Sequence, residues 1–435
     1  MKEDFLHYIW KYKLLPLKKL VTLDGCTLTI LKEGMYNTNA GPDFLNVHLR
    51  IDGQVWVGNV EIHVKSLDWY LHNHEKDKNY EAVILHVVWE YNGDVFMKNN
   101  RCLPTLELKN IIDEQRIENY QNLFSKKRDW IPCGRQIRTV SPFVLSNWLE
   151  RLYFERLEGK SRKIKGLLKA SNKDYEAVLF QLLTKNFGLK VNKDAFLNLG
   201  KSLAFTVVRR ESSNEKRLSA LLFGQGGFLE DDKVENEYYS SLKKEYQYLK
   251  HKYSLNSIGN HQFEFFRMRP NNFPTIRIAQ LVSLYHAHQG LFSKLMKFNR
   301  IEMLYEIFDV EINDFWKKHY TFRTTSKSSR KKITKQFIDL LIINTLVPLK
   351  FVFGKDRGEE ELRGIAMLMQ LKAETNNIVD KFKELLVVPK NALESQALLE
   401  LYNNYCKKKR CLNCAVGNDL IKNFLRMNKN AFSMC

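Results

Sequence analysis

The sequence predicts an α+β domain with a mixed sheet and hairpins over residues 1–135, followed by a large, mainly α-helical region over residues 136–435. In the first part, short apolar runs alternate with polar residues and are broken by turn pairs such as Asp24-Gly25 and Asp52-Gly53, a pattern typical of strands and hairpins. From Ser141 to about Asn404, apolar residues instead recur at helical spacing. This change of period, in a chain of 435 residues, favours two domains.

The composition indicates packed cores and a polyanionic partner. Hydrophobic residues make up 44% of the chain and aromatic residues 12%, which excludes general disorder. The 69 lysines and arginines exceed the 49 aspartates and glutamates, giving a net charge of +20. This excess favours nucleic acid as the partner, because binding phosphates releases counterions. A basic protein without such a partner is the alternative.

We expect a cytoplasmic protein without a membrane span. The most apolar run, residues 337–353, fits a buried helix better than a span, since it contains four interrupting residues: Asp339, Asn344, Pro348 and Lys350. The N-terminus passes directly into an amphipathic pattern, without a signal region. The chain has seven cysteines, an odd number, and disulfides are not expected in a reducing compartment.

The clearest local prediction is a hairpin of residues 44–51 and 54–65 around the turn Asp52-Gly53. Its strict alternation places apolar side chains on one face and a row of polar ones on the other: Asn59, Glu61, His63 and Lys65. A carboxylate, an imidazole and an ammonium on one short strand are suited to binding a divalent cation and orienting a water. The alternative is the solvated outer face of an antiparallel sheet.

The flanks of the hairpin supply further candidate site residues: Asn37, Asp68, His72, His74 and His86. The four histidines from His63 to His86 make zinc bound by imidazoles a rival interpretation.

These segments resemble a known family. Gly41-Pro42-Asp43-Phe44, the run from Gly58 to His63, and Ser66-Leu67-Asp68-Trp69 with His72-Asn73-His74 are similar to the signature of bacterial proteins known only as a domain of unknown function. The resemblance extends along nearly the whole chain, through residues 266–274 and Cys411-Leu412-Asn413-Cys414. It implies no activity by itself.

A looser resemblance does imply an activity. Pro42-Asp43, a strand and a turn, and then Glu61-Ile62-His63 are similar to the PD-(D/E)XK nuclease superfamily. There an aspartate and a glutamate on adjacent strands bind magnesium, and a lysine two residues after the glutamate helps to position the attacking water. The resemblance implies a nuclease-like fold in which Asp43 and Glu61 bind Mg²⁺ or Mn²⁺. His63 stands at the lysine's position; either Lys65 takes that role, or His63 acts as a ligand or proton acceptor.

The register of the hairpin bears directly on this resemblance. Strict alternation pairs Asp43 with Ile62, on the apolar face and away from Glu61. A bulge, or an end of the pairing, at Gly41-Pro42 would turn Asp43 toward Glu61.

Our first hypothesis is therefore a metal-dependent, nuclease-like protein that acts on DNA or RNA phosphodiesters. Its catalytic residues would be Asp43, Glu61, His63 and Lys65. The alternative is a non-enzymatic nucleic-acid-binding or assembly protein on a degenerate nuclease fold, because a histidine replaces the lysine. A zinc hydrolase that uses the histidines is a third reading.

Two further groups of residues are candidates for binding. Cys406, Cys411 and Cys414 have a spacing typical of soft-metal ligands, an iron–sulfur cluster or zinc, with Cys133 as the fourth ligand and Cys435 as its alternative. Reduced cysteines packed as small apolar residues are the other interpretation. Arg267, Arg269 and Arg277 surround a Pro- and Asn-rich turn and are candidates for binding phosphates, although this turn is also a plausible start for a helix.

Overall fold

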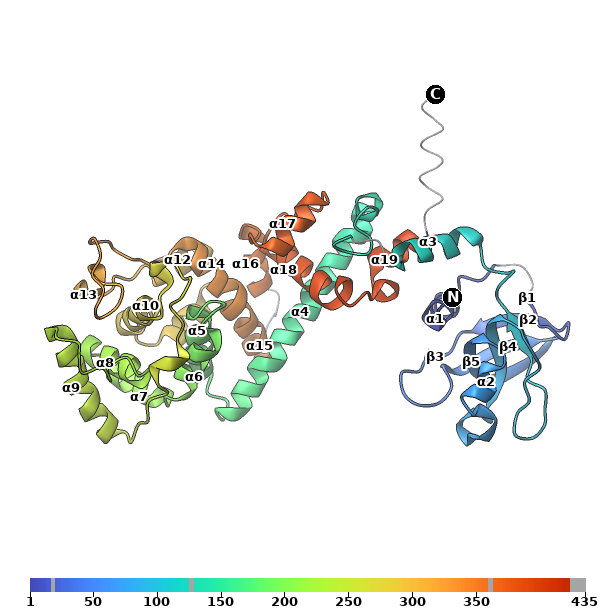
Figure 1. The fold of residues 1–435 in the computed structure, drawn as a ribbon, viewed down its shortest axis with the longest axis horizontal. Coiled ribbons are helices and arrows are strands. Elements are labelled where there is room, and N and C mark those ends of the chain that lie inside the picture. The colour runs from blue at the N-terminus through green and yellow to red at the C-terminus, as the bar shows by residue number, and fades with distance from the viewer. Residues whose placement is uncertain (17–19, 125–128, 359–362, 423–435) are drawn as a thin grey trace, which may run out of the picture. The chain divides into compact units, whose positions relative to one another are not determined.

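The computed structural model describes residues 1–16, 20–124, 129–358 and 363–422. The chain divides into two compact units: Met1–Trp148 with Leu401–Cys435, and Leu149–Glu400. The segment from Leu401, expected in the helical region, therefore belongs with the N-terminal sheet. The fold class is confirmed, since a mixed sheet is followed by a mainly helical region (Figure 1).

The first unit contains a seven-stranded sheet of order β1-β2-β4-β5-β6-β7, with β3 beside β4. The pairs from β1 to β5 are antiparallel, whereas β5–β6 and β6–β7 are parallel. The strands are β1 (Leu20–Val21), β2 (Thr27–Lys32), β3 (Met35–Tyr36), β4 (Phe44–Ile51), β5 (Gln54–Lys65), β6 (Val83–Glu90) and β7 (Thr105–Glu107).

The β4–β5 hairpin forms around Asp52-Gly53, where both residues have positive φ (45° and 84°), as a tight two-residue turn of this type requires. Near the turn, Leu49 lies opposite Trp56, the expected register. Further along, a bulge lies between Phe44 and Val47, and Asn46 within it has a φ of 57°. Phe44 consequently pairs with Val60, one step from the register of strict alternation.

β5 is a central strand, with α1 (Glu3–Lys11) and α2 (Asp68–Leu71) in contact with it (Figure 1). Val60 and Ile62 on its apolar face are fully buried. Its polar face is buried as well at this end, since Glu61 and His63 are only 5% and 1% exposed. The solvated outer face considered above is thus absent at these positions, where His72 and His74 of the segment after β5 lie against His63 and Glu61.

The C-terminal segment packs within the first unit through helical elements. α19 (Ala415–Lys422) contacts α3 (Glu114–Phe124). From α3, Tyr120 stacks on Phe5 of α1 with ring centroids 4.2 Å apart. The segment before α19 consists of two short elements, a π-helix over Leu401–Cys406 and a 3-10 helix over Cys411–Asn413.

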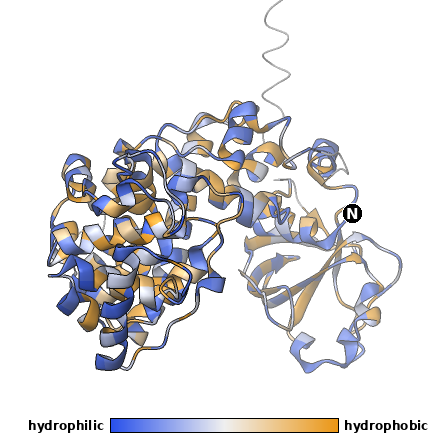
Figure 2. Cartoon of the chain, turned by 60° about the vertical axis from the view of Figure 1, so that its left-hand side comes forward, coloured by the Kyte–Doolittle hydropathy of each residue, from blue (hydrophilic) through white to orange (hydrophobic). Residues whose placement is uncertain are grey.

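The second unit is helical, and Figure 2 shows polar and apolar residues side by side on its helices, as amphipathic packing requires. It comprises most of α4 (Pro142–Ala170), then α5 (Tyr175–Phe187), α6 (Lys193–Lys201), α7 (Phe205–Glu211), α8 (Glu215–Gln225), α9 (Glu237–Lys252), α10 (Pro274–Ala287), α11 (Leu291–Lys297), α12 (Ile301–Phe308), α13 (Asp314–Lys317), α14 (Lys335–Leu341), α15 (Val347–Arg357), α16 (Arg363–Gln370), α17 (Asn377–Glu384) and α18 (Ala392–Glu400).

One helical segment in the described part of the chain, Lys335–Arg357, is long and apolar enough to cross a membrane. Its most apolar window is 78% buried inside the protein. It is therefore a core helix of the second unit, as predicted for residues 337–353.

Candidate functional site

The bulge in β4 brings Asp43 beside Glu61. The Asp43 backbone N–H donates to Glu61 Oε2 (3.1 Å), and the Ile62 N–H donates to Asp43 Oδ2 (2.9 Å). The two predicted metal ligands therefore lie together, although the bulge is at Asn46 and not at Gly41-Pro42. Asn46 is itself held in place, since its N–H donates to Asn59 Oδ1 (3.2 Å).

The parallel strand β6 adds a second imidazole to the site. Its register places His86 next to Glu61. His86 is fully buried, and its Nε2 lies 2.8 Å from His63 Nδ1. The two rings are thus linked by a hydrogen bond beside the Glu61 carboxylate.

The segment after β5 brings two more histidines to the same place. His72 Nδ1 lies 3.1 Å from His63 Nε2, and His74 Nε2 lies 3.2 Å from Glu61 Oε1. Ligand atoms of His63, His72 and His74 all lie within 4.8 Å of one another. Between the last two, Asn73 adopts a left-handed conformation (φ 59°), which Asn tolerates better than most residues.

Two of the predicted site residues shape loops in this structure. The Asp68 carboxylate accepts the Lys65 N–H (2.9 Å) where β5 ends. The Asn37 amide donates to Pro42 O (3.0 Å) and Ala40 O (3.3 Å), which holds the loop before Asp43. Both residues position the candidate ligands from outside the cluster.

α1 contributes two residues that the sequence analysis missed. His7 Nε2 lies 3.2 Å from Asp43 Oδ2 and 3.6 Å from Glu3 Oε1, and the three residues offer ligand atoms within 4.8 Å of one another. A polar pair at i and i+4 beside the apolar residues of an amphipathic helix is the signal that could have found them.

Burial dominates the electrostatics of the cluster. It raises the pKa of Glu61 to about 7, with the Asp43 charge acting in the same direction. It lowers the pKa of His63 to about 2 and that of His86 to about 3, with neighbouring imidazoles adding to the effect. Burial also opposes a charge on His7, but contacts with Asp43 and Glu3 outweigh it and raise its pKa to about 9.

The donor set fits a divalent metal ion. Neutral imidazoles and carboxylates are the ligands of many transition-metal sites. Three ring nitrogens are buried without a hydrogen-bond partner among the described residues: His7 Nε2, His74 Nε2 and His86 Nδ1. The first two lie 3.2 Å from carboxylate oxygens of Asp43 and Glu61, close enough for an ion pair in the metal-free protein.

Lys65, the fourth predicted catalytic residue, differs from the other three in its exposure. Its side chain is exposed, whereas the cluster around Glu61 is buried. Among the described residues, no ion pair joins Lys65 to Asp43 or Glu61.

A cavity of about 370 Å³ lies next to the α1 part of the cluster and includes His7 in its wall. His7 Nδ1 is 3.4 Å from the Tyr36 hydroxyl, and Tyr36 also lines the cavity. Five cationic side chains line it: Lys2, Lys11, Lys408, Lys409 and Arg410. Basic and aromatic groups therefore adjoin the candidate site.

The three candidate phosphate-binding arginines belong to the second unit. Arg267 and Arg269 are exposed. Arg277 is buried, donates to Gln280 Oε1 (2.8 Å) and Asn272 Oδ1 (2.6 Å), and lies over the Phe337 ring. Its charge is therefore engaged inside the unit.

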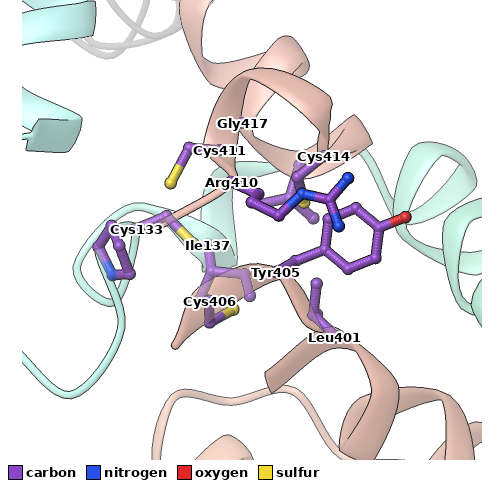
Figure 3. A pocket seen from close by; sticks show the side chains of 11 residues that line it. Cys133, Ile137, Leu401, Tyr405, Cys406, Arg410, Cys411, Cys414 and Gly417 are labelled. Carbon is purple, nitrogen blue, oxygen red and sulfur yellow. The ribbon is translucent and has the colours of Figure 1, made fainter. Parts of the chain in front are cut away.

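The four candidate cysteines come together in the first unit. Cys133, Cys406, Cys411 and Cys414 are buried and line one cavity (Figure 3). Burial and the neighbouring thiols raise the pKa of Cys411 to about 12 and that of Cys406 further. Cys435, the alternative fourth ligand, lies outside the described residues.

Comparison with known proteins gives one match. A family model described as "Protein of unknown function (DUF2851)" matches residues 3–377, most of the chain. The chain belongs to this family, as the resemblance of its motifs predicts. No curated protein and no solved structure matches the chain significantly.

Proposed function

We propose that the protein is a metal-dependent nuclease whose site is built around Asp43 and Glu61. The observation that supports this most strongly is the position of Asp43 beside Glu61 at the β4 bulge, where the Asp43 backbone N–H donates to Glu61 Oε2. Imidazoles from three elements, carrying His7, His74 and His86, adjoin them. Such a set is suited to phosphodiester hydrolysis with a divalent ion.

In this proposal Asp43, Glu61 and His74 hold the ion; their ligand atoms do not all lie within 4.8 Å of one another in the metal-free structure and would draw together around it. Carboxylate oxygens suit Mg²⁺ and Mn²⁺ and imidazoles suit later transition metals, so the mixed set favours Mn²⁺ over Mg²⁺. A bound ion would polarise a phosphoryl oxygen and lower the pKa of a water ligand. His63 lies in hydrogen-bond contact with both His86 and His72 and fixes the orientation of these two rings. The exposed His72 is the ring placed to accept a proton.

The basic cavity supports nucleic acid as the substrate. Its lysines and Arg410 offer charge to backbone phosphates, and Tyr12 and Tyr36 in its wall offer rings on which bases can stack. Because stacking needs unpaired bases, single-stranded DNA or RNA fits this surface better than a duplex. Exposed Arg267 and Arg269 are separate candidates for binding phosphates in the second unit.

A second candidate function is nucleic-acid binding without catalysis. The exposed position of Lys65 favours this second function. Among the described residues, Glu61 is paired with His63 and His74 and not with the ammonium of Lys65. In this case the basic cavity would bind the strand and the buried cluster would have a structural role.

We place the protein in the cytoplasm. The six cysteines in the described part of the chain are all free thiols, the state that a reducing compartment maintains.

The test is cleavage of labelled single-stranded and double-stranded DNA and RNA by the purified full chain with Mn²⁺, Mg²⁺ or Zn²⁺. Glu61→Gln should lower the rate more than about 100-fold. Changing a residue that only supports a metal ligand costs up to about 100-fold, and loss of the ligand itself should cost more. The matched control is Glu90→Gln on β6 of the same sheet, whose partly exposed carboxylate bonds Lys109. It should retain the wild-type rate.

Two results would contradict the nuclease proposal. One is an absence of cleavage by the wild type with every substrate and metal. The other is equal cleavage by Glu61→Gln. Binding of single strands that persists in EDTA without cleavage would support the second candidate function.

A further inference from the structure

Four cysteines from two distant parts of the sequence surround one cavity. Cys133 lies in the loop before α4, and Cys406, Cys411 and Cys414 lie between the end of the Leu401–Cys406 π-helix and the start of α19. Figure 3 shows the four side chains around the cavity, three from the C-terminal segment and one from the earlier loop. These are four of the six free cysteines in the described residues.

The separation of the sulfurs distinguishes between two kinds of metal site. Four sulfurs bound tetrahedrally to one zinc ion, each about 2.3 Å from it, would lie about 3.8 Å from one another. Among the described residues, the groups with ligand atoms within 4.8 Å of one another include no three of these cysteines. The sulfurs are therefore more widely spaced than the ligands of a single ion, as the ligands of a polynuclear iron–sulfur group are.

The surroundings of the cavity suit a negatively charged cluster. Burial raises the pKa of the Cys414 thiol, but the backbone N–H groups at Val416 and Gly417 act in the opposite direction and favour the thiolate, which is the form that binds a metal. The Arg410 guanidinium lines the cavity and lies over the Tyr405 ring, 5.2 Å from its centroid. Its positive charge would offset part of the charge of an anionic cluster.

Gly417 has a specific steric role in this arrangement. A Cβ at this position would lie 2.2 Å from Cys411 O. Only glycine lets the first turn of α19 approach the Cys411 loop this closely. The loop geometry that brings Cys411 and Cys414 to the same cavity therefore depends on it.

We propose that Cys133, Cys406, Cys411 and Cys414 bind an iron–sulfur cluster of the four-iron, four-sulfide type. Each thiol gives up its proton to solvent and binds one iron as a thiolate, and two ferrous ions, two ferric ions and four sulfide ions are supplied from outside, so that no further oxidant is needed. The cluster fastens the C-terminal segment to the loop before α4 within the first unit. The proposal is independent of the nuclease site, because no ligand is shared.

The test is metal and sulfide analysis of the full chain, purified without oxygen and also reconstituted with equal amounts of ferrous and ferric iron and with sulfide. We expect about four iron and four acid-labile sulfide per chain, together with a broad charge-transfer absorption in the visible. Cys133→Ser should lose most of the iron and this absorption. The matched control is Cys102→Ser, an exposed cysteine outside the cavity, which should retain both.

If Cys133→Ser does not fold, reconstitution of the wild-type protein still tests the proposal, because it requires no variant. Zinc without sulfide, or no metal after reconstitution, would overturn the proposal, as would full iron content in Cys133→Ser. Glu61→Gln should retain its iron and sulfide, so a failure of the nuclease proposal and a failure of the cluster proposal give different results.

Discussion

At the scale of residues, Glu61 and His86 occupy surroundings that favour their neutral forms. Burial raises the pKa of Glu61 to about 7 and lowers that of His86 to about 3. A neutral imidazole keeps a lone pair for a metal, and an ionised Glu61 beside it is stabilised once a cation is present. The same burial that makes the metal-free cluster costly thus prepares it to bind an ion.

His86 should make the stability of the metal-free protein depend on pH. Its pKa lies below the unfolded value of about 6.5, so the folded state binds fewer protons and stability falls as the pH drops below that value. Between about pH 6.5 and pH 5 the contribution of His86 alone should fall by about 1.6 kcal/mol, while the raised pKa of Glu61 contributes in the opposite direction. His86→Gln should show a shallower fall in urea unfolding measured in EDTA.

The control for this measurement is His48→Gln, a half-buried histidine on β4 of the same sheet. It should keep the wild-type slope between these pH values. Equal slopes for wild type and His86→Gln would contradict the account of His86.

Sequence patterns could indicate many of the clustered residues but not all of them. Asp43, Glu61, His63 and the later histidines are close in sequence and carry recognisable chemistry. Glu3 and His7 were missed because their contact with Asp43 joins two elements far apart in the chain. The catalytic and metal-binding roles of these residues remain predictions.

At the scale of elements, the β4 bulge determines where Asp43 lies. The hairpin was predictable because Asp52-Gly53 is a strong turn signal. The bulge was not predictable, because Asn46 fits a polar position of the alternating pattern. Only its positive φ, which the sequence does not reveal, marks it as the bulged residue. A shift of one residue moves a side chain to the other face, so this one position changes the neighbours of Asp43.

Substitution of Asn46 tests the importance of the bulge. Asn46→Gly should preserve it, since glycine adopts positive φ freely. Asn46→Val should cost about 1–2 kcal/mol, because a β-branched residue disfavours that conformation. We expect the metal-free Asn46→Val protein to lose the bulge, so that Mn²⁺ binding must restore it at this cost. The affinity for Mn²⁺ in calorimetric titration should then be about tenfold weaker. Equal affinities for the two variants would show that the bulge does not position the ligands.

At the scale of the whole molecule, the C-terminal segment belongs to the unit that carries the candidate site. Fold class was predictable because the change from strand to helical periodicity spans many residues. The return of residues from Leu401 to the first unit was not, because it depends on packing between α19 and α3 and on the cysteine cavity. Through this return, Lys408, Lys409 and Arg410 line the same cavity as His7.

The most direct test of the central claim is anomalous X-ray scattering from crystals of the full chain soaked in Mn²⁺. The account predicts a manganese peak bound by the Asp43 and Glu61 carboxylates and at least one imidazole, with no such peak in Glu61→Gln crystals. A wild-type crystal with saturating Mn²⁺ and no peak between Asp43 and Glu61 would contradict it.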